Sequence, residues 1–419
     1  MATLMRQPPY QLMFKNLYLS RAMKTLFFLL ALALAFAGPA QAQNTQLAID
    51  QATVMPSLAT PGSGSMLDLV EYTDAQGNTY QAGSFTGAVH FGSFAFTSSD
   101  VEVVVAKRNA AGVYQWAIPG GGAGEQRCKA LAVDAAGSVY LTGFFTGSTA
   151  TFGAATLTNR AATGTSTSDV FVTKVTAAGT WDWAASAGGG TRINGDDYGR
   201  AVAVDLFGNV YVAGEYTSSV AFFGPTIQLP TTDPNNAGRE TVFIAKLSPT
   251  GIWQWARRSE YYGGRVSGVI ADRAATVYFV SEYRTLAQFG AFTVTSPYPA
   301  GGLAIAKIDG SGAWQWAVKA QSNARETAIQ CNGLTIGTQN DLYLAGTFNG
   351  DTATFGQTRL VNLGPLVPSL SGATPQRHTA NACLARLNTA TGAWHWAVQS
   401  RGDGYESFSA PVLDGSGGM

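Results

Sequence analysis

The sequence predicts an all-β protein, a β-propeller of four-stranded blades with five complete repeats and the start of a sixth. Three observations support this prediction. One aromatic phrase recurs five times along the 419 residues. Short runs rich in Val, Ile, Tyr, Phe and Trp are bounded by Gly, Asp and Asn, which is typical of strands and turns. No run shows the 3.6-residue period of a helix. A lone four-stranded sheet cannot bury an aromatic face, whereas equal sheets stacked around an axis can.

The composition excludes several classes of protein. The chain has 26 Lys and Arg residues against 26 Asp and Glu residues, so its formal net charge is zero, and only 12% of it is charged. Without a basic excess there is no electrostatic footprint for nucleic acid or for anionic lipid. The hydrophobic share of 46% supplies enough material for a core and rules out wholesale disorder.

Residues 1–42 predict a secretory signal peptide. Met23 and Lys24 open a positively charged start, residues 26–37 are apolar without interruption, and residues 40–42 (Ala-Gln-Ala) have the pattern of a cleavage site. We expect Met23 to be the true start. An apolar run of this length is too short to span a bilayer, so we expect a secreted or cell-surface protein with no transmembrane anchor after cleavage. Residues 43–65 are polar and Gly- and Ser-rich, which predicts a flexible lead-in.

The repeats occupy residues 66–419 and are marked by one phrase, Trp-x-Trp-Ala. Its second Trp recurs after 67, 72, 61 and 80 residues, a longer period than in the common propeller repeats. The units cover about 66–117, 128–184, 199–256, 265–317 and 331–397, with a partial unit at 403–419. The phrase contains all nine tryptophans, with tyrosine in the first slot of unit one: Trp116, Trp181, Trp183, Trp253, Trp255, Trp314, Trp316, Trp394 and Trp396.

Three further columns keep their spacing from unit to unit, and we expect the tyrosines among them to build the repeat core together with the tryptophans. A tyrosine lies in a short apolar run, a Phe-Gly pair follows it, and a basic residue ends a third run. The tyrosines are Tyr80, Tyr140, Tyr211, Tyr278 and Tyr343, and the basic residues are Lys107, Lys174, Lys246, Lys307 and Arg386.

The third unit shows the four predicted strands best. Residues 201–205 form strand A, residues 206–209 turn the chain, and strand B begins over 210–214. Residues 241–246 form strand C and 252–256 form strand D. The two tryptophans of strand D stand at i and i+2, which predicts that both lie on one face and pack against a neighbouring sheet.

Residues 195–214, followed by 242–246, resemble the SBBP-type β-propeller repeat of secreted bacterial proteins. The resemblance recurs from about residue 66 to 414. Unit four departs from it with Ala275 and Ser281 in place of Gly, and unit five has Gly337 in place of the turn Asp. The resemblance implies an extracellular propeller of generally unassigned function, and it supplies no catalytic residues.

Residues 403–417 align with strand A and the turn of the third unit, so a sixth copy begins there. Unit one already has its own strand A around residues 69–74. A five-blade ring would therefore have two segments for one inner position. We expect the sequence to be a fragment of a longer gene product with more blades and a C-terminal surface-attachment module.

A binding surface is expected where the variable loops gather. In an up-and-down meander the B–C and D–A loops share one face, and 15 to 30 residues separate the Phe of each Phe-Gly pair from the basic residue. Long variable loops on a rigid scaffold commonly carry binding sites. The candidate residues are Arg192, Asp196, Asp197, Tyr198, Arg257, Arg258, Tyr261, Tyr262, Arg325, Glu326, Arg401 and Asp403.

Several polar columns have a structural interpretation that we favour over a site. An acid at the first position of the A–B turn is ordinary type I turn chemistry, although it could also bind a metal. The basic column could ring an anion, but a strand-end Lys with its stem buried and its ammonium in water is favoured. Asp196 and Asp197 fall short of the oxygens that calcium needs. We predict no metal and no cofactor. The acids are Asp74, Asp134, Asp205 and Asp272.

No catalytic constellation stands out. His90, His378 and His395 are scattered, and no Ser/His/Asp grouping or phosphate-cradling glycine motif accompanies them.

Cysteine usage gives a separate prediction. Cys128 and Cys331 occupy the same position in units two and five, which are not adjacent, so we expect no disulfide between them. With Cys383 they are expected to be three buried thiols.

The sequence therefore favours a non-enzymatic scaffold, secreted or at the cell surface, that binds an extracellular protein or glycan and no nucleic acid. A propeller-fold glycan hydrolase or lyase is one alternative, and a structural extracellular matrix component is another.

Overall fold

The structure is a computed structural model that describes residues 60–61, 64–160, 167–189, 195–231, 240–259, 264–298, 300–324, 329–337, 339–367, 377–400, 405–408 and 411. The predicted signal peptide, the Met23 start and most of the predicted lead-in lie outside these residues. Every regular element in the described part of the chain is a β-strand. Consequently, no helix in that part could cross a membrane.

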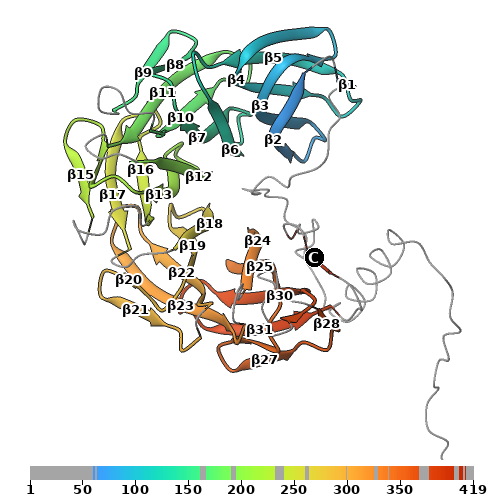
Figure 1. Cartoon of the computed structure of the whole chain (residues 1–419), viewed down its shortest axis with the longest axis vertical. Coiled ribbons are helices and arrows are strands. Elements are labelled where there is room, and N and C mark those ends of the chain that lie inside the picture. Colours follow the sequence, from blue (N-terminus) through green and yellow to red (C-terminus); the bar gives the residue numbers. More distant parts are fainter. Residues whose placement is uncertain are drawn as a thin grey trace, which may run out of the picture. The chain divides into compact units, whose positions relative to one another are not determined.

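Five antiparallel four-stranded sheets follow one another along the chain, each with strand order A-B-C-D (Figure 1). Sheet 1 comprises β2 (Ser65–Thr73), β3 (Thr79–Phe91), β4 (Phe94–Arg108) and β5 (Tyr114–Gly120). Sheet 2 comprises β6 (Gln126–Val133), β7 (Val139–Phe145), β10 (Asp169–Val175) and β11 (Trp181–Gly188). Sheet 3 comprises β12 (Asp197–Val204), β13 (Val210–Tyr216), β16 (Thr241–Leu247) and β17 (Trp253–Arg258). Sheet 4 comprises β18 (Arg265–Ala271), β19 (Val277–Tyr283), β22 (Gly302–Ile308) and β23 (Trp314–Ser322). Sheet 5 comprises β24 (Ile329–Ile336), β25 (Asp341–Phe348), β30 (Asn381–Asn388) and β31 (Trp394–Gln399).

The B–C connections are not simple loops, which corrects the expectation from their length. Each begins with a short hairpin whose turn carries the Phe-Gly pair, and in sheet 1 the ends of β3 and β4 form it themselves, with Phe91 opposite Phe94. Two hairpins also pair with strand D of the preceding sheet, as in Ala187 opposite Phe223. The hairpins are β8 (Thr149–Phe152) with β9 (Ala155–Thr158), β14 (Val220–Phe223) with β15 (Ile227–Pro230), β20 (Leu286–Phe289) with β21 (Phe292–Thr295), and β26 (Thr352–Phe355) with β27 (Thr358–Val361).

Three short strands complete the element list. β1 (Thr60–Pro61) pairs with β3, so the described end of the predicted lead-in is attached to sheet 1. β28 (Leu366–Val367) pairs with β29 (Arg377–His378) in the longest B–C connection.

The A–B turns confirm the turn interpretation of the acidic column. Asp205 Oδ1 accepts hydrogen bonds from the backbone N–H groups of Phe207 and Asn209, both at 2.9 Å. Its Oδ2 accepts the hydroxyl of Tyr211 at 3.0 Å. The same arrangement recurs at Asp74, Asp134 and Asp272. These carboxylates therefore organise turns and hold the tyrosine column.

In the first four phrases the second tryptophan joins its sheet to the next one. The Trp183 indole donates to the carbonyl of Pro249 at 2.9 Å and packs on Gly251, where an added Cβ would lie 2.7 Å from the ring. Gly251 is in the C–D turn of sheet 3 and has a φ of 79°, which glycine adopts without strain. Three other junctions repeat this contact: Trp116 with Ala177 and Gly179, Trp255 with Gly310 and Gly312, and Trp316 with Thr389 and Gly392.

The first tryptophan contacts the preceding sheet, so the expectation that both indoles share one face is wrong. Trp181 donates to the carbonyl of Pro119 at 3.0 Å and stacks edge-on against Phe152, with ring centroids 5.1 Å apart. The cause is a register shift at this point of strand D, which pairs Lys174 with Trp183 and Val175 with Trp181. The extra residue between the indoles turns them toward opposite neighbours.

The basic column lies at the same junctions, near the end of strand C as expected. The expectation that its ammonium stays in water is wrong for Lys246, which is 8% exposed. The Lys246 ammonium is 5.6 Å from the ring centroid of Tyr211 and donates to the carbonyl of Gly310 at 3.1 Å. The Trp255 indole donates to the same carbonyl, so the C–D turn of sheet 4 accepts hydrogen bonds from both Lys246 and Trp255 of sheet 3. Lys307 and Trp316 likewise share the carbonyl of Thr389.

The largest fully buried side chains lie mainly on strands B and C, as in Tyr211 and Phe243. The innermost strands β2, β6, β12, β18 and β24 contact one another in sequence order. Residues 405–408 continue this order. The Glu406 N–H donates to Ala380 O at 2.9 Å, just as the Asp197 N–H at the start of β12 donates to Ser168 O at 2.8 Å.

All three cysteines are free thiols. Cys128 and Cys383 are buried residues, whereas Cys331 is only partly buried, which modifies the expectation for that residue. Burial nevertheless raises the pKa of both the Cys128 and the Cys331 thiols to about 12.

Candidate binding site

The D–A and B–C connections meet at one end of the sheets, as the meander predicts. The Thr217 N–H, after strand B of sheet 3, donates to the carbonyl of Asp196 before strand A, at 3.0 Å. In sheet 2 the Thr146 N–H donates to the carbonyl of Glu125 at 2.9 Å. The A–B and C–D turns, with the indole contacts described above, lie at the opposite end. We call the end where the D–A and B–C connections meet the loop end.

The structure describes five of the twelve candidate binding residues. These are Asp196, Asp197, Tyr198, Arg257 and Arg258. The other seven lie outside the described residues: Arg192, Tyr261, Tyr262, Arg325, Glu326, Arg401 and Asp403.

Asp196 and Asp197 hold the loop end together. Asp197 is 1% exposed, and its carboxylate accepts the Gly189 N–H at 2.8 Å and the Ser218 hydroxyl at 3.0 Å. Burial raises the pKa of Asp197 well above its ordinary value, and the charge of Asp169 adds to the rise. Asp196 accepts the Ser168 N–H at 2.9 Å. Both acids therefore have partners inside the protein.

Arg257 is directed away from the loop end. Its Nε donates to the carbonyl of Gly312 at 2.8 Å, and its guanidinium is 5.8 Å from the ring centroid of Trp255. It therefore supports the junction between sheets 3 and 4. Arg258 lies on the other face of β17, where it pairs with Phe243 and is partly buried. The structure does not bring these arginines together with Tyr198.

Tyr198 instead belongs to a group of charged and aromatic side chains on the innermost strands and on the adjacent strands β7 and β13, which we call the inner-strand network. Its ring meets Phe144 edge-on, with centroids 4.9 Å apart, and the Arg200 guanidinium is 4.7 Å from its centroid. The Lys129 ammonium lies 5.7 Å from the Phe144 centroid on the other side. Stacked cations of this kind are stabilised by the ring quadrupole. The network comprises Asp68, Glu125, Arg127, Lys129, Phe144, Tyr198, Arg200 and Glu215.

Each cation of the network has a carboxylate partner. Asp68 of β2 accepts Lys129 Nζ at 2.7 Å and Arg127 Nη1 at 3.1 Å. Arg200 Nε donates to Glu215 at 2.7 Å. The side chains of the three cations and of Asp68 remain between 21% and 26% exposed, whereas that of Glu215 is fully buried. Burial raises the pKa of Glu215, and the charge of Arg200 opposes this rise.

Sequence reasoning missed the cations of this network, although a signal existed. Lys129 and Arg200 both stand five residues before the turn acid of their unit, and Arg127 and Arg265 both stand seven residues before it. A bulge lies at the position of Lys129, where the register shifts from Cys128 to Ala130 in β6. Comparing columns inside strand A, rather than the loops, would have found them.

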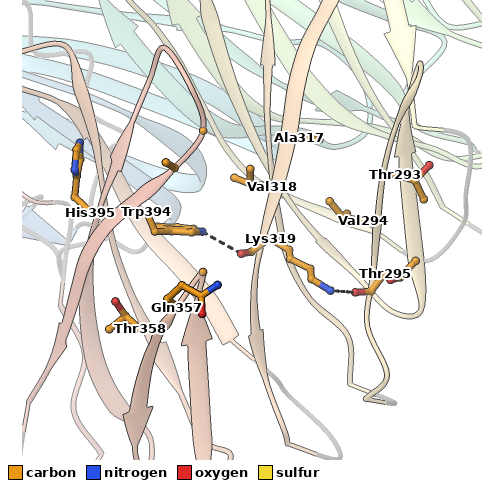
Figure 2. Close-up of a pocket in the computed structure, with 13 residues that line it drawn as sticks. Thr293, Val294, Thr295, Ala317, Val318, Lys319, Gln357, Thr358, Trp394 and His395 are labelled. Atoms are coloured by element: carbon orange, nitrogen blue, oxygen red, sulfur yellow. Dashed lines mark hydrogen bonds between the residues drawn. The ribbon is translucent and has the colours of Figure 1, made fainter.

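A pocket of about 600 Å³ lies elsewhere, between sheets 4 and 5 (Figure 2). Two of its polar side chains are engaged in hydrogen bonds, one between the two sheets and one within unit four. The Trp394 indole donates to the carbonyl of Lys319 at 3.2 Å, and Lys319 Nζ donates to the carbonyl of Thr295. His395 stands at its edge with 42% of its side chain exposed. We therefore assign this pocket a structural role.

Within the described ranges, no group of three or more His, Cys, Asp or Glu side chains is placed to hold a metal ion.

A comparison with protein families finds one match, over residues 187–217, to the family described as SBBP: Beta-propeller repeat. A search of the curated proteins finds no match. The matched residues run from the end of β11 through β12 and β13, and they include Tyr198, Arg200 and the turn acid Asp205. Over these residues, the chain carries a repeat of the SBBP beta-propeller family, as the recurring columns predict.

Proposed function

We propose that the protein is an exported, non-enzymatic propeller scaffold that binds an extracellular protein or glycan at its loop end. The inner-strand network is the observation that supports this proposal. The three cations, Asp68 and Tyr198 come from consecutive innermost strands, while Phe144 and Glu215 come from the adjacent strands β7 and β13. The three cations and Asp68 remain partly exposed. Arginine and tyrosine on a rigid support are typical of recognition surfaces.

The charge balance of the network narrows the ligand class. Its three cations face three carboxylates, so it offers no excess of positive charge to a polyanion. Hydroxyl groups of a sugar, or mixed polar groups of a protein, can accept from the guanidinium groups and donate to the carboxylates without a change in net charge. A hydroxyl-rich or mixed-charge partner is therefore favoured over a polyanion.

The arrangement of the repeats forms part of the same proposal. We take the five sheets as blades, with a sixth unit beginning in residues 403–419. The backbone hydrogen bond of Glu406 supports this, because it repeats the one that starts strand A of sheet 3.

The proposal can be tested by applying the chain from Gln43 onward to arrays of glycans and extracellular proteins. The test variant carries Lys129→Gln with Arg127→Gln, because both side chains belong to the inner-strand network and their carboxylate partners, Asp68 and Glu125, are partly exposed. Arg359→Gln is the matched control, since Arg359 is an exposed arginine on the outer hairpin β27. We expect the double variant to lose binding and the control to keep it. Equal binding by both would contradict the proposed site, and turnover of a polysaccharide would favour the enzyme.

A further inference from the structure

Sheet 5 carries the same junction row as the sheets before it. Tyr343, Arg386 and Trp396 lie side by side across β25, β30 and β31. In sheet 4 the corresponding row is Tyr278, Lys307 and Trp316, and it is covered by the C–D turn of sheet 5. The row in sheet 5 is therefore built for the same kind of contact.

Among the described residues, the row of sheet 5 has no such turn opposite it. In the first four sheets the second tryptophan donates to a carbonyl of the next C–D turn and packs on its glycine. The Trp396 indole has no corresponding carbonyl or glycine in the described part of the chain. Its one ring contact is with Tyr343 in its own sheet, with centroids 6.2 Å apart.

The apolar side chains around this row are also less covered than their counterparts. Tyr343 is 8% exposed, whereas the other four members of its column are at most 1% exposed. Leu384, two residues before the basic column, is 7% exposed, whereas Val105, Val172, Ile244 and Ile305 at that position are at most 1% exposed. The same face is thus buried in four sheets and partly open in the fifth.

The structure also shows where the cover would begin. The Glu406 N–H donates to Ala380 O, and the Asn332 side chain donates to Phe408 O at 3.1 Å. Residues 405–408 thus lie beside β24 of sheet 5 in the way that β12 lies beside β6 of sheet 2. An innermost strand for a further sheet is therefore already started on sheet 5.

We propose that the row Tyr343, Arg386 and Trp396 is a docking surface for a sixth four-stranded repeat of the same type. The innermost strand of this repeat begins at residue 405. Its C–D turn presents a carbonyl to the Trp396 indole and a left-handed glycine to the ring. The inference rests on the blade arrangement proposed above, but it is independent of any ligand at the loop end.

A second copy of the chain is the other conceivable occupant, since sheet 1 has an uncovered C–D turn. Its Gly112 has a φ of 80°, and an added Cβ there would meet no described atom within 4 Å. However, a sheet 1 docked on sheet 5 would bring β2 against β24, and residues 405–408 already contact that strand. This overlap favours the sixth repeat.

The first experiment measures acrylamide quenching of tryptophan fluorescence in the chain from Gln43 to Met419. Trp396→Phe should remove a readily quenched component, whereas the matched variant Trp316→Phe should remove a shielded one. Equal quenching of the two indoles would overturn the proposal. So would shielding of Trp396 that appears together with a doubled mass in sedimentation, because the occupant would then be a second copy.

The second experiment supplies the missing strands by fusing a copy of residues 205–256 after Leu413. We expect Trp396 to become as shielded as Trp316, and the shielding to be lost when Gly251→Val is introduced in the copied turn only. A second fusion with residues 272–317 serves if the first does not fold. Continued quenching of Trp396 in a folded fusion would overturn the proposal. Neither measurement involves the loop-end ligand, so failure here leaves the proposed binding site unaffected.

Discussion

At the scale of single residues, Ala275 shows how a departure from the repeat pattern lowers stability. It occupies the A–B turn position where units one to three have glycine, and its φ is 59°. A Cβ in the left-handed region costs about 1–2 kcal/mol, and the greater chain entropy of glycine offsets part of this. We therefore expect Ala275→Gly to raise the free energy of unfolding by up to about 1 kcal/mol, measured in urea. Ala274→Gly in the same turn is the control and should destabilise. Loss of stability in Ala275→Gly would show that the turn is not strained.

Asp169 gives a prediction for pH. Its side chain is fully buried and accepts the Arg160 N–H at 2.8 Å, and burial raises its pKa from 3.8 to about 7. Between these two values the folded protein holds a proton that the unfolded chain releases. The stability that this group contributes is therefore present at pH 4 and is lost as the pH rises through 7.

Asp169→Asn should remove this dependence. Compared with the parent protein, the variant should gain stability steadily from pH 4 to pH 7, by about 1.4 kcal/mol for each unit of pKa shift removed. Thermal unfolding at several pH values measures it. Asp100→Asn is a suitable control, because Asp100 is exposed. If the difference in stability between the variant and the parent protein did not change between pH 4 and pH 7, Asp169 would not be protonated in the folded state.

At the scale of elements, the C–D turn and the indole of the preceding sheet act as one unit. Gly251 and Gly112 have nearly equal φ values, 79° and 80°, but only Gly251 lies against an indole. Alanine at either position has the same backbone penalty. At Gly251 it must also displace the Trp183 ring, because its Cβ would lie 2.7 Å from it.

We therefore expect Gly251→Ala to cost about 1–3 kcal/mol more than Gly112→Ala, which is the usual range for overpacking. Chemical unfolding of the two variants isolates the docking contact from the backbone term. Equal losses would mean that the turn moves away from the ring without cost.

The sequence predicted strands B, C and D of unit three to within two residues, because each is a short β-branched or aromatic run between turn residues. Strand A begins at Asp197, four residues earlier than predicted. The sequence did not reveal the hairpins at the Phe-Gly pairs. Their strands are four residues long and flank a turn of two or three residues, as in β8 and β9, so they read as part of a long loop. Nor did it reveal that the two indoles diverge, since the simple alternation of a strand fails where the register shifts.

At the scale of the whole molecule, the junctions connect each described sheet to the next one along the chain. Each sheet depends on its neighbours through an indole, a basic side chain and a C–D turn, so stability is expected to be a sum of sheet and junction terms. The order of the repeats was readable from the sequence because the junction residues recur. The inner-strand network was not, because it joins Asp68, Lys129, Tyr198 and Arg200 from three different units, and only the packing of consecutive strands brings them together.

Because each sheet depends on its neighbours, the effect of breaking a junction on stability depends on where that junction lies in the chain. Trp255→Ala removes the contact between sheets 3 and 4, where the indole is 8% exposed and donates to Gly310 O at 3.0 Å. Its loss should cost about 3–5 kcal/mol, as for other buried tryptophans. It should also uncouple the two halves of the array, so that one unfolding transition in urea becomes two. Trp396→Ala is the matched control, because this indole has no following sheet among the described residues, and it should cost less and leave the number of transitions unchanged. A single sharp transition in Trp255→Ala would show that the innermost strands alone couple the sheets.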